Sequence, residues 1–332
     1  MKLLKRGLFG LAIVLVGAFL LLRTPDTDPA AMRAKYGGAP SQFLKLDSGL
    51  TVHVRDEGPR GAPVIVLLHG SNSDLHTWDA WTVLLTPRYR VIRLDQIGHG
   101  LTGPSPGPGS SSGPGSSFGG DYSPAAFDAA IAGVTAQLGV SKFALAGNSM
   151  GGGIALHYAL AHPEHVTALV LIDAGGAPRL GKAAGNIGFT IARTPVLRNL
   201  MLSVTPRSVI AKSLRQSVWN QAVVTPAAID RYWELLRYPG NRQATLTRFA
   251  GGWQSFTPQQ VAALKLPVLV LWGAHDQLIG VQSARWFQQH IAGSDLIVYP
   301  DAGHLPMEEV AQQSAADLTR WLAAHGIGGA PG

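Results

Sequence analysis

Three residues with complementary chemistry each stand directly after an apolar run, far apart along the chain. Ser149 lies in GNSMGG, Asp276 in WGAHDQLI and His304 in PDAGHLPMEE. A serine hydroxyl becomes an effective nucleophile when a histidine accepts its proton, and a carboxylate fixes the tautomer of that histidine. We therefore predict that Ser149 is a nucleophile, His304 its base and Asp276 the acid that orients the base.

The sequence around Ser149 has the pattern G-x-S-x-G. An apolar run at 142–146 leads into it, and a run of small, helix-compatible residues at 152–160 follows. A serine on a sharp turn between a strand and a helix needs glycines on either side, because the backbone is strained and neighbouring elements approach closely. The pattern therefore predicts a nucleophile elbow, with the positive end of a helix dipole beside the reacting atoms.

The elements that must position these residues alternate between strand and helix. Predicted strands span 63–68, 89–95, 142–146, 166–173, 267–272 and 295–299, and two more flank a turn at 47–49. Continuous apolar runs of this kind are typical of strands buried on both faces. We therefore expect an α/β fold with a mostly parallel sheet covered by helices on both faces. The carboxyl ends of its strands share one edge, where the three residues can meet, in the chain order Ser…Asp…His expected for this architecture.

Other residues at that edge have competing interpretations. Asp173 ends the strand after the elbow helix and is the alternative to Asp276 as the acid. His69, His99 and His275 also border the edge, and we interpret them as loop structure. No grouping of His, Asp or Glu in the sequence indicates a metal site, and we expect no metal and no cofactor.

These motifs together resemble the α/β-hydrolases. The resemblance covers about residues 41–325 and includes HGSNSDLHTW and DQIGHGLTG as well as the three motifs above. It implies that His69-Gly70 opens an oxyanion loop, and that the backbone N–H groups of Ser71 and Met150 hold the developing oxyanion. It also implies that residues 179–263, which break the alternation of strand and helix, form a helical cap over the pocket.

A serine at the elbow narrows the chemistry that the resemblance allows. Dehalogenases and epoxide hydrolases place aspartate there, which leaves esterases, lipases, cofactor-free haloperoxidases and serine-dependent carbon–carbon bond hydrolases. The last group commonly has an aromatic residue after the catalytic histidine, whereas Leu305 follows His304 here. We therefore expect hydrolysis of carboxylic esters, in particular hydrophobic or acyl-lipid esters. A carbon–carbon bond hydrolase of the meta-cleavage-product type is the first alternative. A catalytically silent scaffold that binds a ligand or partner is the second alternative.

Both ends of the chain fall outside this domain, and one internal stretch is an insertion within it. Lysines and an arginine precede sixteen uncharged residues at 7–22, a pattern that predicts an uncleaved signal anchor over 1–23, with a cleaved signal peptide as the alternative. The charge bias before this segment puts the catalytic domain on the extracytoplasmic side. Residues 24–40 are interpreted as a linker, the uncharged Gly/Ser/Pro stretch 103–120 as a flexible insertion and 326–332 as a flexible tail.

The charge of the chain is unevenly distributed. The formal net charge is +7, and residues 179–263 alone carry +9. This segment is either a solvated basic face or a surface attracted to anionic lipid head groups or acidic substrates. No nucleic-acid-binding module accompanies the charge, so no nucleic-acid partner is expected. The absence of cysteine excludes disulfides, thiolate metal sites and cysteine nucleophiles.

Overall fold

The computed structural model describes Phe9, Gly17 and residues 19–106, 120–180, 186–251 and 255–328. An eight-stranded sheet runs through this part of the chain in the order β1-β2-β4-β3-β5-β6-β7-β8. The strands are β1 (Ser41–Lys45), β2 (Thr51–Glu57), β3 (Val64–Leu68), β4 (Arg90–Leu94), β5 (Phe143–Asn148), β6 (Val166–Ile172), β7 (Val268–Gly273) and β8 (Asp295–Tyr299). Each predicted strand is present, with ends within two residues of the expected positions.

The directions of the strands confirm a mostly parallel sheet. β2 runs antiparallel to both of its neighbours, β1 and β4, while all other neighbouring pairs are parallel. Because β5, β7 and β8 point the same way, their carboxyl ends lie at one edge of the sheet, where the loops that follow them can converge.

The central strands are buried on both faces because alternate side chains enter two separate apolar cores. In β3, Val66 and Leu68 belong to one core, and Ile65 and Leu67 belong to the other. This alternation is the period of two expected of any strand, and it explains why the strand is apolar throughout.

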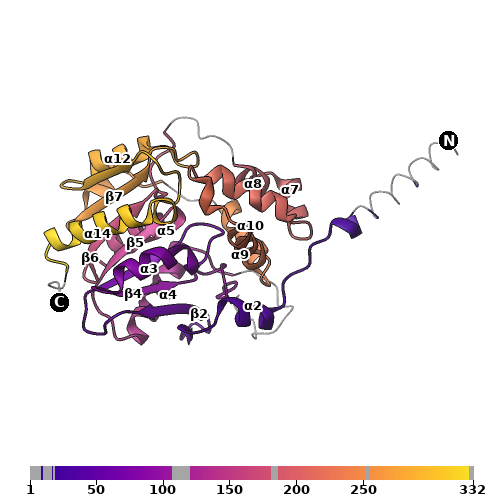
Figure 1. The fold of residues 1–332 in the computed structure, drawn as a ribbon, viewed down its shortest axis with the longest axis horizontal. Helices are drawn as coiled ribbons and strands as arrows, with labels where there is room; N and C mark the ends of the chain where they lie inside the picture. The colour runs from indigo at the N-terminus through magenta and orange to yellow at the C-terminus, as the bar shows by residue number, and fades with distance from the viewer. Residues whose placement is uncertain are drawn as a thin grey trace.

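Helices cover each face of the sheet by packing their apolar side chains into these cores. On one face, Phe127 of α4 and Ile154 of α5 join the first core, and on the other, Trp81 of α3 and Leu318 of α14 join the second. Figure 1 shows α3 and α14 side by side. The elements on the two faces are η1 (Leu75–Trp78), α3 (Asp79–Leu85), α4 (Pro124–Gln137), α5 (Met150–Ala161), α12 (Gln282–His290), α13 (Pro306–Glu309) and α14 (Ala311–Ala324).

Between β6 and β7 the crossover connection is enlarged into a set of helices. They are α6 (Ile187–Arg193), α7 (Pro195–Met201), α8 (Arg207–Ser217), η2 (Gln221–Val223), α9 (Pro226–Leu236), α10 (Asn241–Gly251) and α11 (Pro258–Ala262). Figure 1 shows α7, α8, α9 and α10 together on one side of the sheet. This is the segment 179–263 in which a cap was predicted, and we refer to it as the cap.

The segment predicted as a linker contains a helix, α2 (Pro29–Tyr36), capped by the side chain of Asp28, which accepts from the N–H of Ala31 at 2.7 Å. The chain before α2 is bonded to the cap: the Thr24 N–H donates to a cap carbonyl at 2.7 Å, and Asp26 pairs with Arg242 at 2.6 Å. Local sequence did not reveal these contacts, because their partners lie about two hundred residues away.

Several predicted segments lie wholly or mostly outside the described residues. They are most of the signal anchor 1–23, the part 107–119 of the predicted insertion and the part 329–332 of the predicted tail. Within the residues that the structure does describe, no helix is both long enough and apolar enough to span a bilayer.

Candidate active site

Ser149 lies on the sharp turn between β5 and α5, as the G-x-S-x-G pattern predicts. Its φ of 55° and ψ of −118° are strained for a residue with a side chain. A Cβ atom on Gly147 would overlap the carbonyl oxygen of Gly151, and a Cβ on Gly151 would overlap that of Leu68. The two glycines of the pattern are therefore required by close approach of backbone, and they allow the turn to present the serine at the edge of the sheet.

His304 and Asp276 are brought together at the same edge. Nδ1 of His304 lies 2.7 Å from Oδ2 of Asp276, and both side chains are buried. The other carboxylate oxygen of Asp276 accepts the N–H groups of Leu278 at 2.7 Å and Ile279 at 3.1 Å. The carboxylate is thus held in place by the loop after β7, with one oxygen directed at the imidazole.

Ser149 and His304 line one cavity, so the predicted nucleophile and base face a common space. The side chain of Asn148 donates to the backbone carbonyl of His304 at 3.0 Å, and the N–H of His304 donates to Ser217 of the cap at 2.9 Å. Among the described contacts no hydrogen bond joins Ser149 Oγ to His304. Such a bond often tightens only when substrate is bound.

A buried carboxylate that sequence reasoning missed shapes the histidine loop. Glu309 accepts the N–H groups of Gly303 and Leu305, both at 3.0 Å, on either side of the histidine. It also accepts those of Trp219 at 2.7 Å and Asn220 at 2.8 Å, which belong to the cap. Glu309 therefore ties the cap to the histidine loop. Its only signal in the sequence was its closeness to His304.

Asp173, the alternative acid, lies beside Asp276 rather than beside the imidazole. It is fully buried at the end of β6, and its Oδ1 accepts the N–H of Gly273 at 3.0 Å. Burial, together with the charge of Asp276 and a hydrogen bond to it, raises the pKa of Asp173 well above its ordinary value. Two neighbouring carboxylates do not both ionise readily, so the raised pKa favours the proton on Asp173.

The predicted oxyanion loop approaches the nucleophile closely. A Cβ on Gly70 would lie 2.9 Å from Oδ1 of Asn148 and 3.1 Å from Cβ of Ser149, so a side chain there would crowd the site. Ser71 follows it and borders the same cavities as Ser149. Met150 is the first residue of α5, and N–H groups in the first turn of a helix have no partner within the helix. This placement suits the oxyanion role that the resemblance implies for Ser71 and Met150.

Two cavities meet at Ser149 and Ser71. The first, which we name the cap cavity, has a volume of about 80 Å³. Its cap wall is mostly apolar, with Met201, Val209, Ile210, Leu214 and Leu236, and it also includes Ser213, Ser217 and Tyr232. The second, which we name the arginine cavity, has a volume of about 200 Å³ and is bordered by Met150, Arg193, Arg248, Phe249 and Ile279. The nucleophile is therefore exposed to an apolar space on one side and to a space with two arginines on the other.

The other histidines at this edge have structural partners. Nδ1 of His69 donates to the carbonyl of Gly70 at 2.7 Å, and its Nε2 accepts the N–H of Gln96 at 3.0 Å. Burial lowers the pKa of both His69 and His99, so both rings are neutral. His275 stacks on a cap tryptophan with ring centroids 3.6 Å apart. The interpretation of these histidines as loop structure agrees with their contacts.

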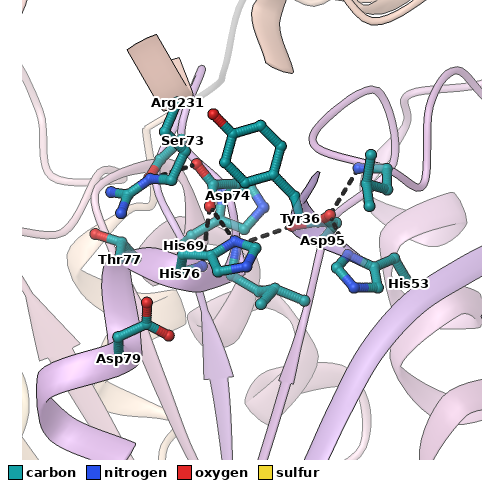
Figure 2. Close-up of polar contacts among 12 residues, drawn as sticks. Tyr36, His53, His69, Ser73, Asp74, His76, Thr77, Asp79, Asp95 and Arg231 are labelled. Carbon is teal, nitrogen blue, oxygen red and sulfur yellow. Dashed lines mark hydrogen bonds and ion pairs between the residues drawn. The ribbon is translucent and has the colours of Figure 1, made fainter. Parts of the chain in front are cut away.

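A network of charged side chains joins the cap to the loop after β3, as Figure 2 shows. Nε of Arg231, in cap helix α9, lies 3.2 Å from Oδ2 of Asp74, and its Nη2 lies 3.8 Å from Glu308. Asp74 also bonds to the ring of His76 at 2.8 Å. The charge of Arg231 is therefore balanced inside the protein by two carboxylates.

Two groups of described side chains place potential metal ligands within 4.8 Å of one another. One is formed by Asp173, Asp276 and His304, whose hydrogen bonds to one another already account for their closeness. The other is formed by His162, Glu164 and His165, at the end of α5. The expectation that the reaction needs neither metal nor cofactor stays a prediction.

Comparisons with known proteins agree with this architecture. The chain is 27% identical to a 2-hydroxy-6-oxononadienedioate/2-hydroxy-6-oxononatrienedioate hydrolase of Klebsiella pneumoniae, over 86% of this chain and 96% of that protein. Among solved structures it resembles a membrane phospholipase A, described as a bacterial virulence factor, with a TM-score of 0.69, 25% identity and coverage of 98% and 99% of the two chains. It also shares its fold with a thermophilic esterase from Thermogutta terrifontis, with a TM-score of 0.69, 24% identity and coverage of 86% and 99%.

A family model described as the alpha/beta hydrolase fold matches residues 63–310, which include the elbow, the Asp276 loop and the His304 loop. The match extends over most of the sheet and the whole cap. The chain therefore belongs to the α/β-hydrolase fold family and is a hydrolase.

Proposed function

We propose that this protein hydrolyses carboxylic esters through Ser149, His304 and Asp276. The observation that carries the proposal is the 2.7 Å bond between His304 and Asp276, in a cavity that also contains the elbow serine. Ser149 would attack the ester carbonyl while His304 takes its proton, and the alcohol would leave with that proton. Water activated by His304 would then attack the acyl-enzyme and release the acid.

Backbone N–H groups would stabilise the charge that develops on the carbonyl oxygen. In this proposal the donors are the N–H groups of Ser71 and Met150, each worth roughly 10²- to 10³-fold in rate. Asp276 would hold His304 in the tautomer that accepts a proton from Ser149, and would stabilise the imidazolium that forms.

The walls of the site favour a hydrophobic ester. The cap side of the cap cavity is mostly aliphatic, with one methionine beside two serines and a tyrosine. Its apolar part would bury an acyl or alkyl chain with a gain of about 0.8 kcal/mol per methylene. A phospholipase and an esterase are among the proteins that this chain resembles. We therefore propose acyl-lipid or other hydrophobic esters as the substrate class.

A carbon–carbon bond hydrolase of the meta-cleavage-product type is the second candidate. The similarity to the Klebsiella pneumoniae dienedioate hydrolase favours it. Against it stands Leu305, which occupies the position after His304 where such enzymes commonly have an aromatic side chain.

A substrate panel separates the two candidates. We expect the purified protein to hydrolyse p-nitrophenyl esters, with kcat/KM depending on acyl length, and to cleave a ring-fission dienoate far more slowly. A serine-reactive fluorophosphonate should abolish ester turnover in proportion to the labelling of Ser149. Faster cleavage of the dienoate than of every ester would favour the carbon–carbon reaction instead.

We also propose that residues 1–23 anchor the protein to a membrane with the catalytic domain on the extracytoplasmic side. The basic and apolar sequence of that segment supports the proposal, and a net charge of +9 over 179–263 would draw the cap toward anionic lipid. We expect esters dispersed in anionic vesicles to be hydrolysed faster than those in neutral vesicles, with the difference lost at high salt. Equal rates on both kinds of vesicle would count against attraction by the cap.

A further inference from the structure

Arg248, in cap helix α10, is a buried cation next to the predicted oxyanion donors. Its side chain is only 6% exposed. Nη1 lies 3.3 Å from Oγ of Ser71 and 2.8 Å from Sδ of Met150, and Nη2 lies 3.1 Å from Oγ1 of Thr245. The guanidinium therefore touches the side chains of both residues whose backbone N–H groups would bind the oxyanion.

No carboxylate balances Arg248 among the described residues. Arg231 has Asp74 and Glu308, and Arg242, on the same helix as Arg248, has Asp26 at 2.6 Å. The contacts of Arg248 are instead two hydroxyl groups and a thioether, and its buried Nε has no hydrogen-bond partner.

An unpaired charge in such a place is costly, since burial removes its hydration and no opposite charge replaces it. This desolvation lowers the pKa of Arg248 to about 9, so the side chain still carries its charge at neutral pH. A protein that keeps a cation buried at its active site without a counter-ion has a place there for an anion.

The space in front of Arg248 leads to the nucleophile. Arg248 and Ser149 both border the arginine cavity of about 200 Å³, and none of the described residues that line it is acidic. Arg193 borders the same cavity. On its other side Arg248 borders a wider cavity of about 780 Å³, with Tyr122 and Phe256 in its walls and again no acidic residue.

We propose that Arg248 binds an oxyanion carried by the ester substrate, either a carboxylate or a phosphate, and so selects acidic esters. This inference rests on the proposed ester hydrolysis at Ser149. A guanidinium offers several N–H donors in a planar fork that matches both kinds of oxyanion. The apolar part of the substrate would lie in the cap cavity and its charged part in the arginine cavity, on either side of the scissile carbonyl.

Two pairs of substrates distinguish the source of the charge. In the first pair the acyl chain of a p-nitrophenyl ester ends in a carboxylate (the glutarate monoester) or in a methyl group (the valerate). In the second pair a monoacylglycerol does or does not carry a phosphate on its glycerol. The measured quantity is the ratio of kcat/KM for the charged ester to that for the neutral one, which does not depend on the fraction of folded enzyme.

We expect Arg248→Gln to lower this ratio by about 10- to 100-fold for at least one pair, the range expected for a hydrogen bond to a charged group. Arg248→Lys should restore part of it, because the charge returns without the planar fork. Arg215→Gln is the matched control: it removes one positive charge from an exposed position of the cap outside all three cavities, and should leave the ratio unchanged.

The outcomes separate this inference from the proposed function. If Arg248→Gln slows charged and neutral esters equally, Arg248 only supports the oxyanion loop and the inference is wrong. If the wild-type protein hydrolyses none of these esters, the proposed function fails, and binding still tests Arg248. For that case, calorimetry with an N-alkyl glutaramate, an uncleaved amide that keeps the carboxylate, should show binding to the wild type that Arg248→Gln weakens by at least about 10-fold. Equal binding to both proteins would overturn the inference.

Discussion

Replacing Ser149 by alanine is expected to lower kcat for p-nitrophenyl esters by about 10⁴- to 10⁶-fold, the range found when a triad nucleophile is removed. The loss is large because neither His304 nor Asp276 can assist a reaction that has lost its nucleophile. The residual rate of the variant comes from the oxyanion donors and from substrate binding. Steady-state hydrolysis at saturating ester measures the effect.

The same substitution should hardly change the stability of the fold. The Ser149 side chain makes no capping hydrogen bond to α5, and alanine at φ 55° is strained to the same extent as serine. The matched control is Ser123→Ala, because Ser123 caps α4 through a bond to the N–H of Ala126. That variant should keep kcat while its free energy of unfolding falls by about 1 kcal/mol.

Undiminished ester hydrolysis by the Ser149→Ala protein would show that the triad assignment is wrong. If the wild type and the Ser149→Ala variant are both inactive but bind the same ligand, the protein is instead a catalytically silent scaffold of this fold. Labelling with a fluorophosphonate distinguishes these cases, because only an activated serine reacts with it.

The sheet and the elbow were predictable from sequence because their causes are local. A strand buried on both faces must be apolar at every position, and the turn at Ser149 needs glycines where any Cβ would overlap neighbouring backbone. The meeting of Asp276 with His304 followed from one general rule, that parallel strands end at a common edge. The catalytic roles of these residues stay predictions.

Arg248 and Glu309 could not be predicted in the same way. Their significance comes from contacts across the fold: Arg248 reaches back to Ser71, and Glu309 reaches residues of the cap ninety positions earlier. Such contacts depend on how the cap helices pack over the sheet edge, which no local pattern encodes. The helix α2 escaped prediction for a similar reason, since much of what holds that segment lies on the cap.

Substituting each of the two buried aspartates by asparagine tests which of them is the catalytic acid, because we expect opposite effects on kcat. Asp276→Asn should lower kcat by about 10⁴-fold, because an amide donates to Nδ1 of His304 and favours the wrong tautomer. Asp173→Asn should leave kcat near that of the wild type. Its new amide is uncharged, as a protonated carboxyl is, and its oxygen can still accept the N–H of Gly273.

The pH profile of kcat tests whether ionisation of Asp173 affects catalysis. If Asp173 had only a structural role, the wild type and Asp173→Asn would have the same profile. Because the pKa of Asp173 is raised, its proton is lost only at a higher pH than that of an ordinary carboxyl group. Ionisation would then place a second negative charge beside Asp276 and disturb its bond to His304. Asp173→Asn cannot ionise and should retain its activity to a higher pH than the wild type does. If instead Asp173→Asn were the variant that lost activity and Asp276→Asn the one that kept it, Asp173 would be the acid, as in the alternative assignment.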